Sequence, residues 1–107
     1  MTENSYEEVS IKLKAISSQK RLKIIDMLSC GELCACEILE KFDISQPTLS
    51  CDMKKLEEAK LVKSRREGKN TYYSLNKKSL NHLLDRLESI FSNDPDCTCH
   101  SKERMEY

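Results

Sequence analysis

The segment ISQPTLSCDMKKLEEAKLV, residues 44–62, constrains the fold more than any other part of the chain. Ser45 is a good N-cap residue, and Pro47 falls in the first helical turn, where its missing N–H costs nothing. A buried stripe at helical spacing follows, made of Leu49, Met53 and Leu56. A shorter helix is expected just before this segment, running through Leu33, Ile38, Leu39 and Phe42. Two helices joined by a short turn in this way are typical of a helix-turn-helix.

Two further helices are predicted before this pair. Residues 4–16 carry Tyr6, Val9, Leu13 and Ile16 at helical spacing and form an amphipathic helix. Ser18 can cap a second helix, which ends near Cys30 with Gly31 in the stop position.

A hairpin and a long helix are predicted after the helix-turn-helix. Residues 61–75 contain two β-favouring runs around Gly68, which supplies the tight turn. Asn76 can cap a last helix with a broad apolar face. A hairpin directly after a recognition helix makes a winged helix-turn-helix: mainly α, with about five helices and a two-stranded wing.

The composition favours one domain that forms a homodimer. Apolar residues make up 38% of the 107-residue chain and charged residues 34%, which is polar for a lone globular domain. The first and last helices are too apolar to stay exposed, so we expect them to form the dimer interface. Residues 1–92 form the predicted domain. Helical periodicity stops at Ser92, and residues 93–107 form a predicted flexible tail that contains cysteines.

Basic residues gather where a helix-turn-helix protein contacts double-stranded DNA. Between Lys54 and Lys69 there are seven basic residues and three acidic ones, although the whole chain has no net charge. Such a local basic face fits phosphate contacts. The predicted DNA-binding residues are Ser45, Gln46, Thr48, Ser50, Cys51, Asp52, Lys54, Lys55, Arg65, Arg66 and Lys69.

The chain contains six cysteines but no sign of export. Its first ten residues are acidic and polar, and no apolar run is long enough for a membrane helix. We therefore expect a cytoplasmic protein with no membrane partner, in which clustered cysteines bind metal or sense redox state rather than form structural disulfides. Cys34 and Cys36 are two residues apart, a spacing that does not place side chains together on a regular helix.

Three stretches of the sequence resemble the ArsR/SmtB family of metal-responsive repressors, and its arsenite-responsive ArsR members in particular. They are ELCACEILEKF, ISQPTLSCDMKKLEEAKLV and RREGKNTYYSL. The resemblance implies a homodimeric winged-helix repressor that binds an inverted-repeat operator and leaves it when metal binds. It also implies regulated genes for arsenic resistance.

The resemblance implies that arsenite, or alternatively antimonite, is held by three thiolates. Cys34 and Cys36 supply two of them. The third is left open between the tail cysteines, Cys97 and Cys99, and the less favoured Cys30. If both tail cysteines join, a four-thiolate site results, which suits Cd(II) or Pb(II) better. No organic cofactor is expected, and a zinc site at His82 is disfavoured because the last helix has no second histidine.

The sequence departs from the family pattern at three positions. Leu39 stands where the arsenite box usually has a third cysteine. Cys51 and Asp52 stand where many relatives have two histidines. An aspartate that faces DNA repels phosphate, unless it accepts a hydrogen bond from a cytosine amine.

Cys34 is expected in the first turn of its helix. Bringing both sulfurs onto one ion would therefore bend or unwind that turn, and this would disturb the recognition helices.

Two other functions stay open at this point. The same repressor could respond to thiol oxidation, although Glu32 and Glu37 beside the cysteines should raise the thiol pKa and oppose oxidation. A thiol-rich metal carrier that does not bind DNA is disfavoured by the basic wing, but Asp52 supports it. An enzyme is not expected, because no catalytic arrangement of cysteine and histidine is visible.

Overall fold

The structure is a computed structural model that describes residues 3–92, so Cys97 and Cys99 lie outside the described residues, and the boundary at residue 92 stays a prediction. The described part contains five helices and three strands. Their order is α1 (Glu3–Ile16), α2 (Gln19–Leu28), β1 (Leu33–Cys34), α3 (Ala35–Lys41), α4 (Gln46–Glu58), β2 (Val62–Glu67), β3 (Asn70–Leu75) and α5 (Lys77–Phe91). The predicted winged helix-turn-helix is confirmed.

Three helices begin at the side chains expected to cap them. Ser18 accepts a hydrogen bond from the N–H of Arg21, Ser45 from that of Thr48, and Asn76 from that of Ser79. Each side chain satisfies a backbone donor that the helix itself leaves unpaired. The polar residues that interrupt the apolar periodicity therefore fix where α2, α4 and α5 begin.

The sheet has one more strand than the sequence predicts. Its order is β1-β3-β2, with both pairs antiparallel. Leu33 pairs with Tyr73 and Cys34 with Tyr72, so Leu33 belongs to a strand and the expected short helix begins only at Ala35. The short strand pairs with the edge of β3 that β2 leaves open. A strand of two residues shows too little alternation to be predicted from the sequence.

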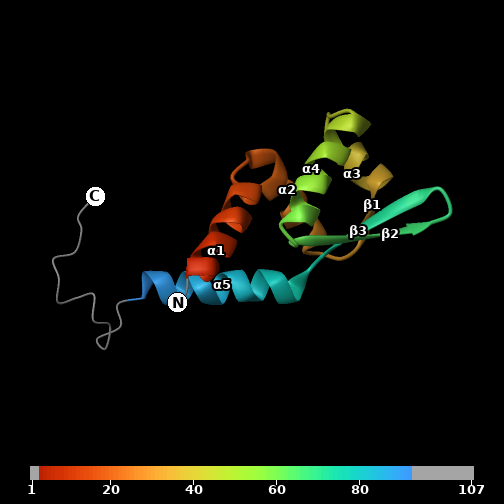
Figure 1. Cartoon of the computed structure of the whole chain (residues 1–107). Coiled ribbons are helices and arrows are strands. Elements are labelled where there is room, and N and C mark those ends of the chain that lie inside the picture. Colours follow the sequence, from red (N-terminus) through yellow and green to blue (C-terminus); the bar gives the residue numbers. More distant parts are fainter. Residues whose placement is uncertain (1–2, 93–107) are drawn as a thin grey trace, which may run out of the picture.

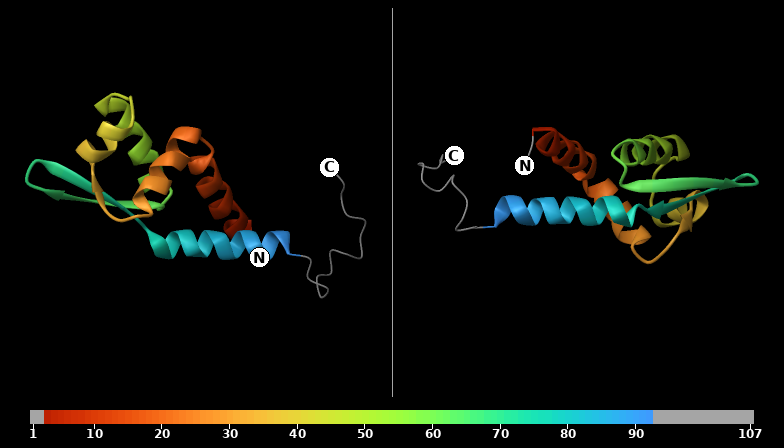
Figure 2. Two further views of the ribbon diagram at one scale, coloured as in Figure 1. Left: turned by 180° about the vertical axis from the view of Figure 1, so that it is seen from behind. Right: turned by 60° about the horizontal axis from the view of Figure 1, so that its bottom comes forward.

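Helix α1 holds the described part together. It packs against α2, α4 and α5, and in Figure 1 its N-terminal end meets α5 at a steep angle. Both views in Figure 2 show the β2–β3 hairpin, the wing, projecting away from α5. The core between these elements contains Ile24, Leu28, Ile38, Leu49, Met53, Leu56 and Leu61, all essentially inaccessible to solvent. The buried stripe predicted for α4 is thereby confirmed.

Several large apolar side chains on α1 and α5 remain exposed in the single chain. On α5, Leu84 is 62% exposed and Phe91 78%, and on α1 Tyr6 and Ile11 are each about half exposed. No helix within residues 3–92 is both long enough and apolar enough to cross a bilayer.

The C-terminus of α4 is closed by a backbone motif that strains one residue. Lys60 has a φ of 64°, in the left-handed region, where a residue with a Cβ is sterically disfavoured. Its N–H donates to the carbonyl of Glu57, and the N–H of Leu61 donates to that of Leu56, both at 2.9 Å. This is the geometry in which glycine usually ends a helix.

Lys60→Gly should therefore raise the free energy of unfolding by about 1 kcal/mol, since glycine adopts this conformation without steric cost. Urea unfolding of the reduced protein, at one fixed concentration, measures the change. Lys63→Gly, in the extended strand β2, is the control and should lower stability. A Lys60→Gly protein no more stable than the wild type would contradict this account of the α4 terminus.

Candidate DNA interface and cysteine site

Helix α4 presents most of the predicted DNA-binding residues on its exposed face. Ser45 and Thr48 also bond to each other, with the Ser45 hydroxyl 3.0 Å from that of Thr48, which rigidifies the start of the helix. Thr48 is half-buried. The exposed members of the predicted set are Ser45, Gln46, Ser50, Cys51, Lys54 and Lys55 on α4 and its cap, and Arg65, Arg66 and Lys69 on the wing.

Asp52 does not lie on that face, so the expectation that it faces DNA is wrong. It is only 5% exposed, and its Oδ1 accepts a hydrogen bond from the Arg21 guanidinium at 3.1 Å. Its Oδ2 makes no hydrogen bond but lies 3.2 Å from the ammonium of Lys20. A buried carboxylate requires such partners. Asp52 thus ties the recognition helix α4 to α2, and its charge is neutralised inside the protein.

On the wing, Arg65 is engaged by two carboxylates. Its Nε and Nη2 donate to the two oxygens of Glu32 at 2.8 and 2.7 Å, and its Nη1 donates to Glu67 at 3.1 Å. The guanidinium also lies over the ring of Tyr72, 4.6 Å from its centroid. The hydrogen bond from Arg65 lowers the pKa of Glu32, and Glu32 and Glu67 in turn raise the pKa of Arg65.

The two cysteines of the ELCACE segment are joined by a disulfide, with their Cα atoms 5.3 Å apart. Cys34 is the N-cap of α3 and has an extended backbone, φ −82° and ψ 155°. Because Cys34 is in β1 rather than inside a helical turn, its side chain meets that of Cys36 without any unwinding. The expectation that Cys34 lies in the first turn of the helix is therefore wrong. That one ion bound by both sulfurs bends this turn, and that the neighbouring glutamates oppose oxidation, stay predictions.

The two carboxylates expected to disfavour oxidation each have a hydrogen-bond partner. Glu37 accepts a hydrogen bond from the backbone N–H of Cys34 at 2.8 Å, which forms part of the α3 cap. Glu32 is bound to Arg65. Each carboxylate therefore has a structural partner of its own.

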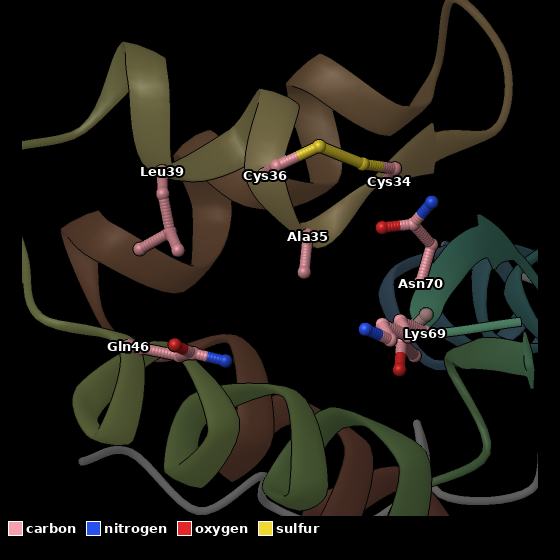
Figure 3. Close-up of a pocket in the computed structure, with 8 residues that line it drawn as sticks. Cys34, Ala35, Cys36, Leu39, Gln46, Lys69 and Asn70 are labelled. Carbon is pink, nitrogen blue, oxygen red and sulfur yellow. A yellow bond between two sulfur atoms is a disulfide. The ribbon is translucent and has the colours of Figure 1, made fainter.

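The cysteine pair borders a cleft of about 170 Å³ between α3, the start of α4 and the wing turn. Figure 3 shows the disulfide on one wall, Gln46 of α4 on another, and Lys69 of the wing turn and Asn70 at the start of β3 on a third. Cys34 is buried and Cys36 is exposed, so the pair can be reached from solvent on one side. The cysteine pair therefore lines the same cleft as two of the predicted DNA-binding residues, Gln46 and Lys69.

The described residues offer no third ligand to this pair. Cys30 is exposed and borders a different hollow, with Met27, Leu33 and Lys41. Within residues 3–92, no group of three or more histidine, cysteine, aspartate or glutamate side chains could hold a metal ion. The remaining candidates of the predicted set, Cys97 and Cys99, fall outside the described part of the chain.

The sequence did not predict the roles of Arg21 and Tyr72 or the pairing of Glu32 with Arg65. The burial of Asp52 had a signal, because its position on the helical wheel lies about 40° from that of Leu56, beside the apolar stripe, and a carboxylate there requires a cationic partner. The Glu32–Arg65 pair had none, since the two residues are 33 positions apart.

Comparison with known proteins gives consistent matches. Residues 18–64 match the family described as "Bacterial regulatory protein, arsR family". The chain is 45% identical to an "Arsenical resistance operon repressor" of Staphylococcus xylosus over 95% of this chain and 98% of that protein. A protein of the same name from Staphylococcus aureus is 46% identical over 89% of this chain and 91% of its own length. Among solved structures, HlyU from Vibrio cholerae N16961 has a TM-score of 0.70 at 28% identity, covering 85% of this chain and 98% of that one.

Asp52→Ala should lower the free energy of unfolding by about 3 kcal/mol, because it leaves the half-buried charge of Arg21 without its partner. The adjacent exposed Cys51→Ala is the control and should change stability by less than about 0.5 kcal/mol. Urea unfolding at equal protein concentration measures both. Equal stability of the two variants would show that Asp52 does not anchor α4.

Proposed function

Because the chain belongs to the arsR family of bacterial regulatory proteins, we propose that it is a cytoplasmic repressor that binds operator DNA as a homodimer and leaves it on binding arsenite or antimonite. The regulated genes are those of arsenic resistance. The support for this trigger is the disposition of Cys34 and Cys36 in a chain so similar to two arsenical resistance operon repressors.

DNA binding is proposed through the start of α4 and the wing. Gln46 and Ser50 lie near the N-terminal end of α4, where a recognition helix reads base edges in the major groove. Lys54, Lys55, Arg66 and Lys69 are exposed cations that suit phosphate contacts. With Asp52 turned inward, the exposed face of α4 is more basic than the sequence alone suggests.

Homodimerisation is proposed through the apolar face that α1 and α5 leave uncovered. Leu84 and Phe91 are the most exposed large apolar residues of α5, and Tyr6 and Ile11 add to the exposed apolar surface from α1. Covering such side chains supplies the free energy of association, at roughly 25 cal/mol per Å² buried. A dimer also places two recognition helices one DNA turn apart, as an inverted-repeat operator requires.

The inducer is proposed to bind the reduced cysteine pair. Trivalent arsenic prefers thiolate ligands, and a disulfide sulfur has no thiolate to offer, so the pair must first accept two electrons and two protons from a dithiol reductant. Cys34 and Cys36 then supply two adjacent sulfurs at the edge of the cleft. Cys97 or Cys99 is proposed as the source of the third.

A second candidate trigger is oxidation of the same pair, and the disulfide itself favours it. A hydroperoxide would convert the two thiols to this disulfide and be reduced to an alcohol and water.

Cadmium or lead remains the alternative metal trigger if both tail cysteines join the pair. The metal-carrier hypothesis loses its support, because the carboxylate of Asp52 does not face DNA.

Fluorescence anisotropy with labelled DNA from upstream of the gene tests the proposed trigger. Reduced protein should bind tightly, and arsenite should lower its affinity at least tenfold, whereas cadmium should not. Cys34→Ser and Cys36→Ser should each abolish this release and leave DNA binding intact, because one remaining thiolate of the pair cannot hold the ion. The exposed Cys30→Ser, which lies in another hollow, is the matched control.

Three results would contradict the proposed trigger. Release by cadmium alone would favour the four-thiolate site. Release by hydroperoxide but not by arsenite would favour the redox trigger. Absence of DNA binding in moderate salt would exclude a repressor.

Leu84→Glu should weaken self-association at least tenfold, because it places a charge in the proposed apolar interface. Ser89→Glu adds the same charge at an exposed polar position about 140° around α5 and is the control. Sedimentation velocity over a concentration series measures both. If Leu84→Glu associates as the wild type does, α5 does not form the interface.

A further inference from the structure

The Glu32–Arg65 ion pair joins the segment just before the cysteine pair to the wing. We propose that Arg65 is a positioning residue: through Glu32 and Tyr72 it passes a change at Cys34 to the wing, and it does not itself contact a DNA phosphate. The proposal rests on the proposed function and names the contacts through which inducer binding changes the DNA-binding surface.

The contact between Arg65 and Glu32 crosses the whole sheet. Arg65 is on β2, at one edge, and Glu32 immediately precedes β1, at the other. Both oxygens of Glu32 are bound by the fork of the guanidinium, at 2.8 and 2.7 Å. This paired geometry fixes orientation as well as distance, which a single hydrogen bond between flexible side chains does not.

Tyr72 lies in the middle of this link. It is the register partner of Cys34 on β1 and of Arg65 on β2, so the three residues form one row across the sheet. The Arg65 guanidinium lies over the Tyr72 ring, 4.6 Å from its centroid. The Arg65 side chain is therefore held by Tyr72, the register partner of Cys34, and by Glu32, which lies two positions before Cys34 in the sequence.

The backbone of Cys34 is restrained by two contacts, so a movement of this residue affects its neighbours. Its backbone N–H is held by Glu37, and its main chain pairs with β3 at Tyr72. When the sulfur of reduced Cys34 binds an ion, a shift of its main chain alters either the pairing with Tyr72 or the position of Glu32. Both are tied to Arg65, so the wing moves relative to α3, and Lys69 at the wing turn moves with it.

Arg65 is poorly suited to a phosphate. Of its five N–H donors, one on each nitrogen is already taken by a carboxylate oxygen. Two carboxylates beside the guanidinium would also repel an approaching phosphate. Arg66 follows it on the strand and projects to the opposite face of the sheet, so it provides a matched cation outside the link.

The test compares Glu32→Gln, Arg65→Gln and Arg66→Gln in the reduced full-length protein. For each, anisotropy gives the affinity for operator DNA at several salt concentrations, with and without arsenite, and thiolate–arsenic absorbance gives arsenite binding. Circular dichroism checks folding, which is expected to hold because all three side chains are exposed.

We expect Glu32→Gln and Arg65→Gln to bind arsenite as the wild type does but to reduce the arsenite-induced loss of DNA affinity at least tenfold. Their salt dependence should be unchanged. Arg66→Gln should lower the salt slope by about one for each phosphate that the side chain no longer neutralises, and it should retain full arsenite-induced release. The double variant Glu32→Gln/Arg65→Gln should be no worse than either single one, since both break the same link.

The proposal is overturned if Arg65→Gln lowers the salt slope as Arg66→Gln does while release persists, because Arg65 would then bind a phosphate. It is also overturned if Glu32→Gln releases DNA as fully as the wild type. Failure of the wild type to respond to arsenite would instead refute the proposed function, and the salt slope of Arg65→Gln would still decide whether this residue contacts phosphate.

Discussion

The pairing of Leu33 and Cys34 with β3 is the contact on which the other features of this molecule depend. It is short, yet it determines where Cys34 lies: at the edge of the sheet that forms the wing, beside Cys36 in the first turn of α3. Cys34 then begins α3, and α3 supports α4. One residue thus belongs at the same time to the sheet and to the start of the helix-turn-helix, so a change in its chemistry can reach both DNA-binding elements.

This arrangement accounts for how a chain with no net charge can present a basic surface. The carboxylates near the wing and α4 are used internally: Asp52 pairs with Arg21 and Lys20, and Glu32 with Arg65. Their charges hold helices and strands together and do not oppose DNA. Under the proposal that Arg65 is a positioning residue, the phosphate contacts fall to the lysines and to Arg66.

The fold followed from the sequence because its signals are local. Ser18, Ser45 and Asn76 cap helices within a few residues of themselves, and Gly68 makes a tight turn between two adjacent strands. The site was predictable only in part, because its decisive contacts are distant in sequence. Two residues of β1 carry too little periodicity to reveal a strand, and the partner of Asp52 is 31 positions away. On a regular helix, Cys34 and Cys36 would point apart. Their side chains meet because Cys34 has an extended backbone, which the sequence did not predict.

Amide hydrogen exchange of the reduced protein, with and without one equivalent of arsenite, tests the central claim most directly. If the sulfur pair is coupled to the wing through the β1–β3 pairing, arsenite should accelerate exchange at Leu33 and Cys34 and at their partners Tyr72 and Tyr73 on β3. If the change were instead confined to α3, with exchange in residues 70–75 unaltered, arsenite would act on the helix alone and the proposed route through the wing would be wrong.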